Sequence, residues 1–302
     1  MGMDWRDRTV FVTGATGLLG RWLVPMLCDL GATVTALVRD RVPASPLDPR
    51  ATEVRGVVED ADLCRRIMTE YETDTVFHLA AQTIIGTARR DPLATFRTNV
   101  GGTWNVLVGA GRAGVRRVIV ASSDKVYGVH SGLCDEQLPL RGRSPYDVSK
   151  VCADHLALSY GAVVTRSGNM FGGGDLNWNR LVPGTIRSAM RGTRPILRSD
   201  GTMVRDYVFV QDVVRAYQLL AEHPEAVGAY NIGANPMPTM GMCRLILAAM
   251  DRPDLEPVIG GAASDEIPSQ MLNATRLLWL GWVPSEIHAG LRETVQWYRD
   301  HL

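Results

Sequence analysis

The 302-residue chain is 46% hydrophobic and 21% charged, which allows one large α/β domain or two smaller lobes. Its 32 basic and 32 acidic residues argue against a nucleic-acid or anionic-membrane partner, because both need a basic excess. We find no signal-peptide core and no apolar run of membrane-span length, so we expect a cytoplasmic protein with neither kind of partner.

Strands and helices alternate through the first half of the chain. Short apolar strands are predicted at residues 9–12, 33–38, 75–79 and 117–122, with helices ending near Leu30 and spanning residues 60–71 and 92–111. This alternation predicts βαβ units and therefore an α/β fold with a doubly wound parallel (Rossmann) sheet. Ligands of such a sheet bind at the carboxyl ends of its strands.

The pattern changes near residue 170. Residues 172–180 predict a loop, followed by a helix at 181–191, a strand pair within 196–210 and a helix at 212–222. The Pro- and Gly-rich segments 235–238 and 260–261 are expected to connect small elements. We therefore predict a dinucleotide-binding domain over residues 1–169 and a smaller mixed α/β substrate lobe over residues 170–302, interleaved with the first.

A glycine-rich turn joins the first strand to its helix. Gly14 permits a tight turn, Gly17 lets backbone approach a phosphate, and Gly20 lets the helix pack on the strand. The helix N-terminus adds N–H groups and a positive dipole. This spacing is typical of short-chain dehydrogenases, so we predict NAD or NADP as the cofactor. Thr16 and Leu18 belong to the same turn.

The end of the second strand leaves the type of cofactor open. Asp40 could accept hydrogen bonds from the ribose hydroxyls of NAD, whereas Arg39 would suit the 2′-phosphate of NADP. Because the two residues are adjacent, the sequence does not choose between them.

Four titratable residues predict redox chemistry coupled to loss of water. Tyr146 and Lys150 lie one helical turn apart, and such a pair removes a hydroxyl proton while a nicotinamide takes the hydride. We expect the charge of Lys150 to lower the pKa of Tyr146 toward neutrality. Asp124 and Lys125, just past a strand, add an acid and an amine. His78 is expected to be structural, and no metal site is predicted.

Several motifs resemble the extended short-chain dehydrogenase/reductase family, the NAD-dependent epimerases and dehydratases of nucleotide sugars. Epimerases usually have small residues after the catalytic serine, whereas 4,6-dehydratases have Thr/Ser-Asp-Glu, or Ser-Asp-Lys in the CDP-glucose branch. This chain has Ser123-Asp124-Lys125, and residues 173–180 and 198–207 also look like the CDP-glucose branch. The other motifs are residues 13–20, 78–82, Asn99, 122–128, 146–150, Asn169 and 205–207.

The resemblance implies a closed redox cycle on a nucleoside-diphosphate sugar, with a tightly bound cofactor regenerated in each turnover. Tyr146 would take the C4 hydroxyl proton and Lys150 would bind the nicotinamide ribose. Lys125 would remove the C5 proton, Asp124 would protonate the departing C6 hydroxyl, and Ser123 would bind the C4 oxygen. These roles need a protonated Asp124 and an uncharged Lys125, and burial favours the neutral form of both.

The resemblance also implies contacts to both ligands. Leu79, Ala80, Ala81 and Asn99 are expected at the cofactor. An arginine is a bidentate donor suited to a diphosphate. The substrate residues are expected to be Gln82, Asn169, Asn179, Arg180, Arg205 and Glu266, with Asp265 beside the last. In the family two helices of each subunit, here about 92–111 and 147–159, form a bundle, so we expect a homodimer or homotetramer.

Two departures and several alternatives remain. Val57 stands where relatives usually have an aspartate near the adenine, and residues 155–163 are shorter than expected, which should trim the end of the Tyr-Lys helix. A nucleotide-sugar 4-epimerase, decarboxylase or ketoreductase could use the same scaffold. A non-catalytic NAD(P)-binding protein would not need Tyr146 and Lys150 together. Cytidine is the favoured base, and GDP- or UDP-linked sugars stay possible.

Overall fold

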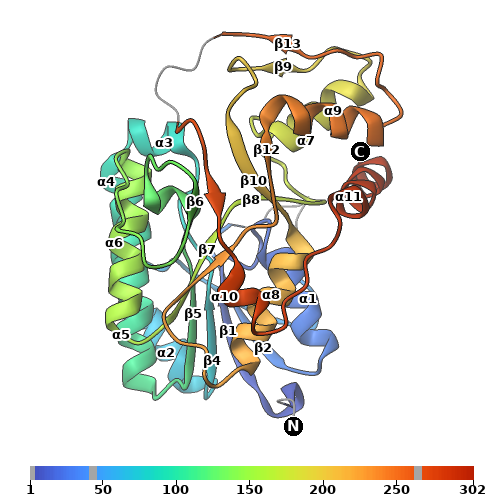
Figure 1. Ribbon diagram of the computed structural model, residues 1–302. Helices are drawn as coiled ribbons and strands as arrows, with labels where there is room; N and C mark the ends of the chain where they lie inside the picture. The colour runs from blue at the N-terminus through green and yellow to red at the C-terminus, as the bar shows by residue number, and fades with distance from the viewer. Residues whose placement is uncertain (1–3, 41–45, 262–266) are drawn as a thin grey trace.

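The computed structural model describes residues 4–40, 46–261 and 267–302, arranged in a large and a small lobe (Figure 1). A seven-stranded sheet in the order β11-β7-β5-β4-β1-β2-β3 forms the large lobe, and every pairing within it is parallel. This order confirms the predicted doubly wound sheet. The strands are β1 Thr9–Thr13, β2 Thr33–Val38, β3 Thr52–Arg55, β4 Thr75–His78, β5 Arg117–Ala121, β7 Val163–Ser167 and β11 Ala229–Ile232.

Apolar residues alternate between the two faces of the sheet and determine which helices cover each face. In β1, Val10 and Val12 pack in one core cluster with residues of α1 and α8, whereas Phe11 packs in another with residues of α2 and α5. The helices of this lobe are α1 Gly20–Asp29, α2 Ala61–Glu70, α3 Ile85–Arg90, α4 Pro92–Phe96, α5 Thr103–Ala113, α6 Pro145–Ser159 and α8 Val210–Glu222.

The helix predicted over residues 92–111 is interrupted. Between α4 and α5, residues Arg97–Gly102 form a wider π-helical turn, which brings the buried Asn99 inward. Such turns occur often at functional sites. Further on, α6 spans the 15 residues Pro145–Ser159, and a short turn at 160–162 leads from it into β7.

The small lobe contains a three-stranded sheet in the order β12-β10-β8 and a pair β13-β9. Two sequence predictions are wrong here. Residues 196–210 form two strands that do not pair with each other, and the expected connector 235–238 is strand β12, antiparallel to β10. The elements are β8 Asn169–Phe171, α7 Leu181–Met190, β9 Ile196–Leu197, β10 Val204–Phe209, β12 Asn235–Pro238, α9 Thr239–Ala249, β13 Val258–Ile259 and α11 Ile287–His301.

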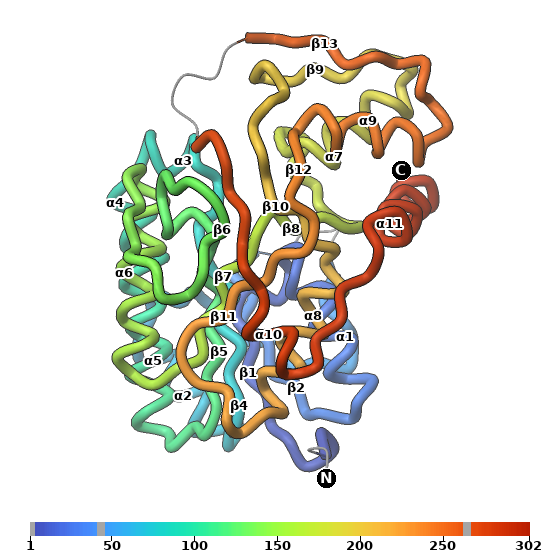
Figure 2. The backbone as a smooth tube through the Cα atoms, viewed as in Figure 1, coloured from blue at the N-terminus to red at the C-terminus, as the bar shows by residue number. Residues whose placement is uncertain are grey.

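The chain passes between the lobes more than once. Figure 2 shows β11 beside β7 in the large sheet, although segments before and after it lie in the small lobe. Within the part of the chain described, no helix is long and apolar enough to cross a membrane. The remaining short elements are the 3₁₀ turns Trp5–Asp7 and Asp124–Tyr127, the paired strands β6 Leu133–Cys134 and β14 Met271–Leu272, and α10 Thr275–Leu278.

Candidate active site

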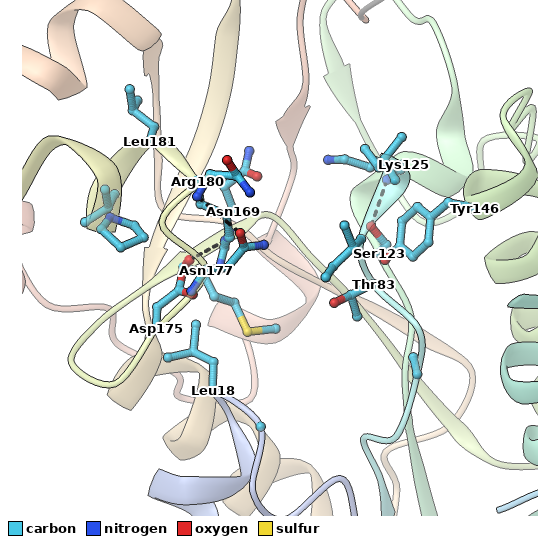
Figure 3. Close-up of a pocket in the computed structure, with 18 of the residues that line it drawn as sticks. Leu18, Thr83, Ser123, Lys125, Tyr146, Asn169, Asp175, Asn177, Arg180 and Leu181 are labelled. Carbon is cyan, nitrogen blue, oxygen red and sulfur yellow. Dashed lines mark hydrogen bonds and ion pairs between the residues drawn. The ribbon is translucent and has the colours of Figure 1, made fainter. Parts of the chain in front are cut away.

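A cleft of about 1590 Å³ lies between the lobes, at the carboxyl ends of the sheet strands. This volume exceeds that of an ordinary small-molecule pocket and suits two large ligands. Figure 3 shows Ser123, Lys125 and Tyr146 on one wall and Asn169 and Arg180 facing them across the cleft. Of the predicted cofactor residues, the cleft is lined by Gly14, Thr16, Gly17, Leu18, Gly20, Arg39, Asp40, Leu79, Ala80, Ala81, Tyr146 and Lys150.

The glycine turn is built so closely that side chains would not fit. Gly14 has a φ of +72°, and a Cβ there would lie 2.7 Å from the Ala80 nitrogen. A Cβ on Gly20 would lie 2.3 Å from the Gly14 oxygen. The first residues of α1 therefore pack directly on the turn, with backbone from 14 to 20 forming the cleft wall. This cradle fits a dinucleotide pyrophosphate.

Gly20→Ala is therefore expected to weaken cofactor binding about tenfold or more, because the new methyl group displaces the phosphate-binding backbone. Cofactor titration by fluorescence, with a thermal melt alongside, measures the effect. Gly111→Ala is the control, because a Cβ at Gly111 meets nothing within 4 Å. Unchanged affinity in Gly20→Ala would contradict the assignment.

The rim of the cofactor half has mixed charge. The Arg39 guanidinium donates to the Asp40 carboxylate at 2.6 Å, and both side chains are exposed. Val57, which replaces the expected aspartate, also lines this part of the cleft.

A buried hydrogen-bonded chain fixes the strand ends beneath the cofactor half. His78 Nδ1 lies 2.8 Å from Thr13 Oγ1, and His78 Nε2 lies 2.9 Å from Thr103 Oγ1. Burial lowers the pKa of His78 to about 3, so the ring is neutral. His78 therefore joins β1, β4 and α5.

Asn99 and Gln82 support the cleft from behind, and neither lines it. The Asn99 amide accepts from the Gln82 N–H at 2.7 Å and donates to Ser149 Oγ at 2.9 Å. The Gln82 side chain turns back to the Ile84 carbonyl oxygen at 3.0 Å. Both side chains are thus occupied in fixing the loop after β4 to α6, away from the ligand positions predicted for them.

The turn after β5 brings an acid and an amine together. Ser123 caps the 3₁₀ turn, its Oγ accepting from the Lys125 N–H at 3.3 Å and donating to Asp124 Oδ1 at 3.1 Å. Lys125 Nζ lies 3.2 Å from the same Oδ1. Asp124 Oδ2 is buried and has no hydrogen-bond partner among the described residues. One carboxylate oxygen is thus fixed and the other is left for a ligand.

A buried ion pair supports this turn. Arg166 Nη2 donates to Asp154 Oδ1 at 2.8 Å, with both side chains almost fully buried. Ser122 Oγ donates to Asp154 Oδ2 at 2.7 Å. The strand end that positions Ser123 is therefore tied to α6.

The sequence of α6 explains how Tyr146 and Lys150 reach the cleft. Ser144 and Asp147 form a capping box and Pro145 occupies the first turn, so the helix begins just before Tyr146. The four-residue spacing places Tyr146 and Lys150 on one face. Both are buried, and Lys150 Nζ donates to the Ala121 carbonyl oxygen at 2.6 Å.

The electrostatics of this pair differ from the sequence prediction. Burial raises the pKa of Tyr146 to about 12, against the opposing effect of a hydrogen bond with Ser123. Burial also lowers the pKa of Lys150 to about 8. The expected lowering of the Tyr146 pKa is therefore wrong for the protein without ligands, because burial of the phenol outweighs the hydrogen bond with Ser123.

Lys150→Met is expected to stabilise the cofactor-free protein by about 1–3 kcal/mol at pH 7 and to abolish turnover. The folded pKa of Lys150, about 8, lies below the ordinary 10.5, so the unfolded chain binds this proton more tightly. The loss of folding free energy caused by the charged Lys150 is therefore complete below pH 8, and it fades as the pH rises to 10.5. Urea unfolding near pH 8 and near pH 10.5 measures the difference in unfolding free energy between Lys150→Met and the unmodified protein. This difference should shrink at the higher pH, and a difference that does not change with pH would contradict the assignment.

The opposite wall contains four of the predicted substrate residues, whereas Gln82 lies behind the cleft. Arg180 Nη1 donates to Asp175 Oδ2 at 2.6 Å, and Arg205 Nη1 donates to the Ile267 carbonyl oxygen at 2.7 Å. Asn179 accepts from Arg198 at 2.8 Å. Asn169, Asn179, Arg180 and Arg205 all line the cleft. Asp265 and Glu266 lie outside the described residues.

Unsatisfied polar atoms gather in this one cleft. Among the described residues, seven buried side-chain atoms lack a hydrogen-bond partner, and six belong to residues lining the cleft. Native proteins rarely leave such groups unpaired, so their clustering indicates a polar ligand. The six residues are Asp124, Ser167, Asn169, Tyr207, Thr239 and Gln270. Sequence reasoning missed Ser167, Tyr207, Thr239 and Gln270 as site residues, although Tyr207 lies in a motif that it noted.

Two curated relatives are nucleotide-sugar dehydratases. The chain is 33% identical over 315 residues to a dTDP-glucose 4,6-dehydratase of Streptomyces griseus, covering 97% of this chain and 94% of the relative. It is 29% identical over 253 residues to a CDP-glucose 4,6-dehydratase of Salmonella typhimurium, covering 74% and 69%.

Solved structures of two enzyme types share the fold. A dTDP-glucose 4,6-dehydratase of Streptomyces venezuelae with NAD bound has a TM-score of 0.88 and 27% identity, covering 97% of both chains. A UDP-glucose 4-epimerase of Thermotoga maritima has a TM-score of 0.89 and 27% identity, covering 97% of this chain and 99% of the other. The model of the NAD-dependent epimerase/dehydratase family matches residues 10–233, and the chain belongs to that family.

Proposed function

We propose that the protein is a nucleotide-sugar 4,6-dehydratase, which converts a nucleoside-diphosphate hexose to its 4-keto-6-deoxy derivative with loss of water. The observation that supports this most strongly is the contact of 3.2 Å between the buried Asp124 and the partly buried Lys125, in the cleft that contains Ser123 and Tyr146. Reversible oxidation at C4 needs only a base and a hydride acceptor. The additional acid and amine suit elimination across C5 and C6.

Each residue has one task in this cycle. The glycine turn at residues 14–20 would hold the nicotinamide cofactor, which would supply a reversible hydride acceptor for C4 and C6. Tyr146 takes the C4 hydroxyl proton, with Ser123 donating to the same oxygen. Lys125 removes the C5 proton, which the C4 ketone acidifies, and Asp124 protonates the C6 hydroxyl as it leaves as water. Lys125 then returns its proton to C5 as C6 is reduced, and proton exchange with solvent restores the starting states of Tyr146 and Asp124.

The Asp124–Lys125 pair can supply acid and base together if one proton moves between them. Transfer from the lysine ammonium to the carboxylate leaves two neutral groups, and burial favours neutral groups over a charged pair. Asp124 Oδ2, buried without a partner among the described residues, is the oxygen from which this proton could be delivered.

The lysine content of the chain supports the same roles. The sequence has 30 arginines and two lysines, and the two lysines are Lys125 and Lys150. An arginine stays protonated at any ordinary pH, whereas a lysine amine can release its proton when buried. Lysine thus occurs only at two positions of the cleft, where a titratable amine is useful.

We propose NAD as the cofactor and a cytidine-linked hexose as the substrate. The family is described as NAD dependent, and the solved dehydratase of Streptomyces venezuelae has NAD bound. The Ser-Asp-Lys triplet and the loop at 173–180 favour the CDP-glucose branch. Arg180 and Arg205 line the cleft where the diphosphate would bind.

A homodimer through α5 and α6 suits the exposed apolar side chains on this side of the large lobe. Leu93, Trp104 and Tyr160 are 61%, 53% and 48% exposed. Burial of such side chains at an interface is favourable.

The main alternative is a 4-epimerase, which would use Ser123, Tyr146 and Lys150 on the same fold. Incubation with NAD⁺ or NADP⁺ and CDP-, UDP-, dTDP- or GDP-hexoses, followed by mass spectrometry, separates the two. Loss of one water without net reduced cofactor supports the dehydratase and identifies the base. Interconversion of epimers at constant mass would refute it.

A further inference from the structure

Gln270 reaches the catalytic turn from a distant part of the sequence. It lines the cleft and is only 4% exposed. Its Oε1 lies 3.4 Å from Lys125 Nζ, which makes it the second acceptor for this amine beside Asp124 Oδ1. Its Nε2 is buried and has no hydrogen-bond partner among the described residues. The amide thus has one end on Lys125 and the other free for a ligand.

The backbone around Gln270 is fixed, so this contact is not a chance approach of a loose side chain. The Gln270 N–H donates to the Val204 carbonyl oxygen at 3.1 Å, and the Val204 N–H donates to the Pro268 carbonyl oxygen at 3.0 Å. Two residues later, the Leu272 N–H donates to Asp206 Oδ2 at 3.0 Å. The segment therefore follows β10 of the small lobe and brings Gln270 to the turn of the large lobe.

Two acceptors determine how a neutral Lys125 amine is oriented. Such an amine has two N–H groups and one lone pair. If Asp124 Oδ1 and Gln270 Oε1 each accept one N–H, the lone pair points away from both. We propose that Gln270 is a positioning residue for proton removal at C5, which with Asp124 aims the lone pair of Lys125 at the sugar. This inference rests on the proposed dehydratase function.

The neutrality of Gln270 is part of the inference. A carboxylate at this position would stabilise the ammonium form of Lys125 and thereby remove the base. Among the described residues, the other titratable or charged groups around the turn include Asp124 beside Lys125, Tyr146, Asp147 and Lys150 on α6, Cys134 on β6, Arg205, Asp206 and Tyr207 on β10, and Arg180 before α7.

The test compares Gln270→Glu and Gln270→Leu with the unmodified protein, using two readouts. The first is NMR of protein labelled at the lysine side chains, which gives two Nζ signals because the chain has two lysines; Lys125→Met assigns them. The second is exchange of the C5 proton in deuterated water across a pH series. Gln137→Glu, an exposed change outside the cleft, is the control.

We expect both variants to shift the Lys125 Nζ signal and Gln270→Glu to move the rising limb of C5 exchange to higher pH. Gln270→Leu should slow exchange about tenfold or more at every pH. Oxidation at C4 should stay within about threefold in both, which shows an intact fold and cofactor site.

An unchanged Lys125 Nζ signal and unchanged C5 exchange in both variants would overturn the inference while the dehydratase function stands. If the unmodified protein neither exchanges C5 nor loses water from any substrate, the proposed function fails and the inference fails with it.

Discussion

Asp124→Asn should stop water loss while leaving oxidation at C4. The rate of dehydration is expected to fall about 10²- to 10⁴-fold, because asparagine matches the shape of the carboxyl group but cannot deliver a proton to the departing hydroxyl. Reduced cofactor should then accumulate up to the enzyme concentration. Absorbance of the reduced nicotinamide and mass spectrometry of the sugar measure the two halves of the reaction separately.

Lys125→Met separates the base from the acid. This variant should lose C5 exchange in deuterated water, whereas Asp124→Asn should keep it. Asp62→Asn, on the exposed face of α2, is the control and should behave as the unmodified protein does. Unimpaired water loss in Asp124→Asn would mean that the acid is another group, and the Asp124–Lys125 pair would lose its assigned role.

Tyr146→Phe should block the cycle at its first step. Removal of the hydroxyl group is expected to lower the rate of C4 oxidation about 10²- to 10⁴-fold, so that no reduced cofactor appears. This outcome differs from that of Asp124→Asn, in which reduced cofactor accumulates. Single-turnover absorbance measures it, with Tyr71→Phe at an exposed position as the control.

The raised pKa of Tyr146 adds a spectroscopic expectation. With a pKa of about 12, Tyr146 is protonated at neutral pH in the ligand-free protein. Ultraviolet difference spectra of the unmodified protein and Tyr146→Phe should therefore show no phenolate from this residue below about pH 10. Oxidation within threefold of the unmodified rate in Tyr146→Phe would contradict its role as base.

The sheet was predictable because its signals are local. The strands are short apolar runs, and the glycine turn directly follows β1. Strand β12 was missed because Pro236 and Pro238 resemble a connector. A proline is tolerated there because β12 is the edge of its sheet, where some N–H groups have no strand to pair with.

The site was predictable where one short segment contains the chemistry. The Ser123–Lys125 turn and the spacing from Tyr146 to Lys150 can be identified in the sequence and lie together in the cleft. Gln270 could not be identified, because its position depends on pairing between β10 and the segment before β14. The pKa of Tyr146 could not be predicted either, because burial determines it.

The most direct measurement uses a nucleotide hexose carrying deuterium at C4. A 4,6-dehydratase should release one water and give a product with the label at C6, because the hydride taken from C4 returns within the same active site. An epimerase would return the label to C4 without loss of mass. Two results would contradict the account. One is a sugar of unchanged mass that keeps its deuterium at C4, and the other is a sugar that has lost its deuterium without losing water.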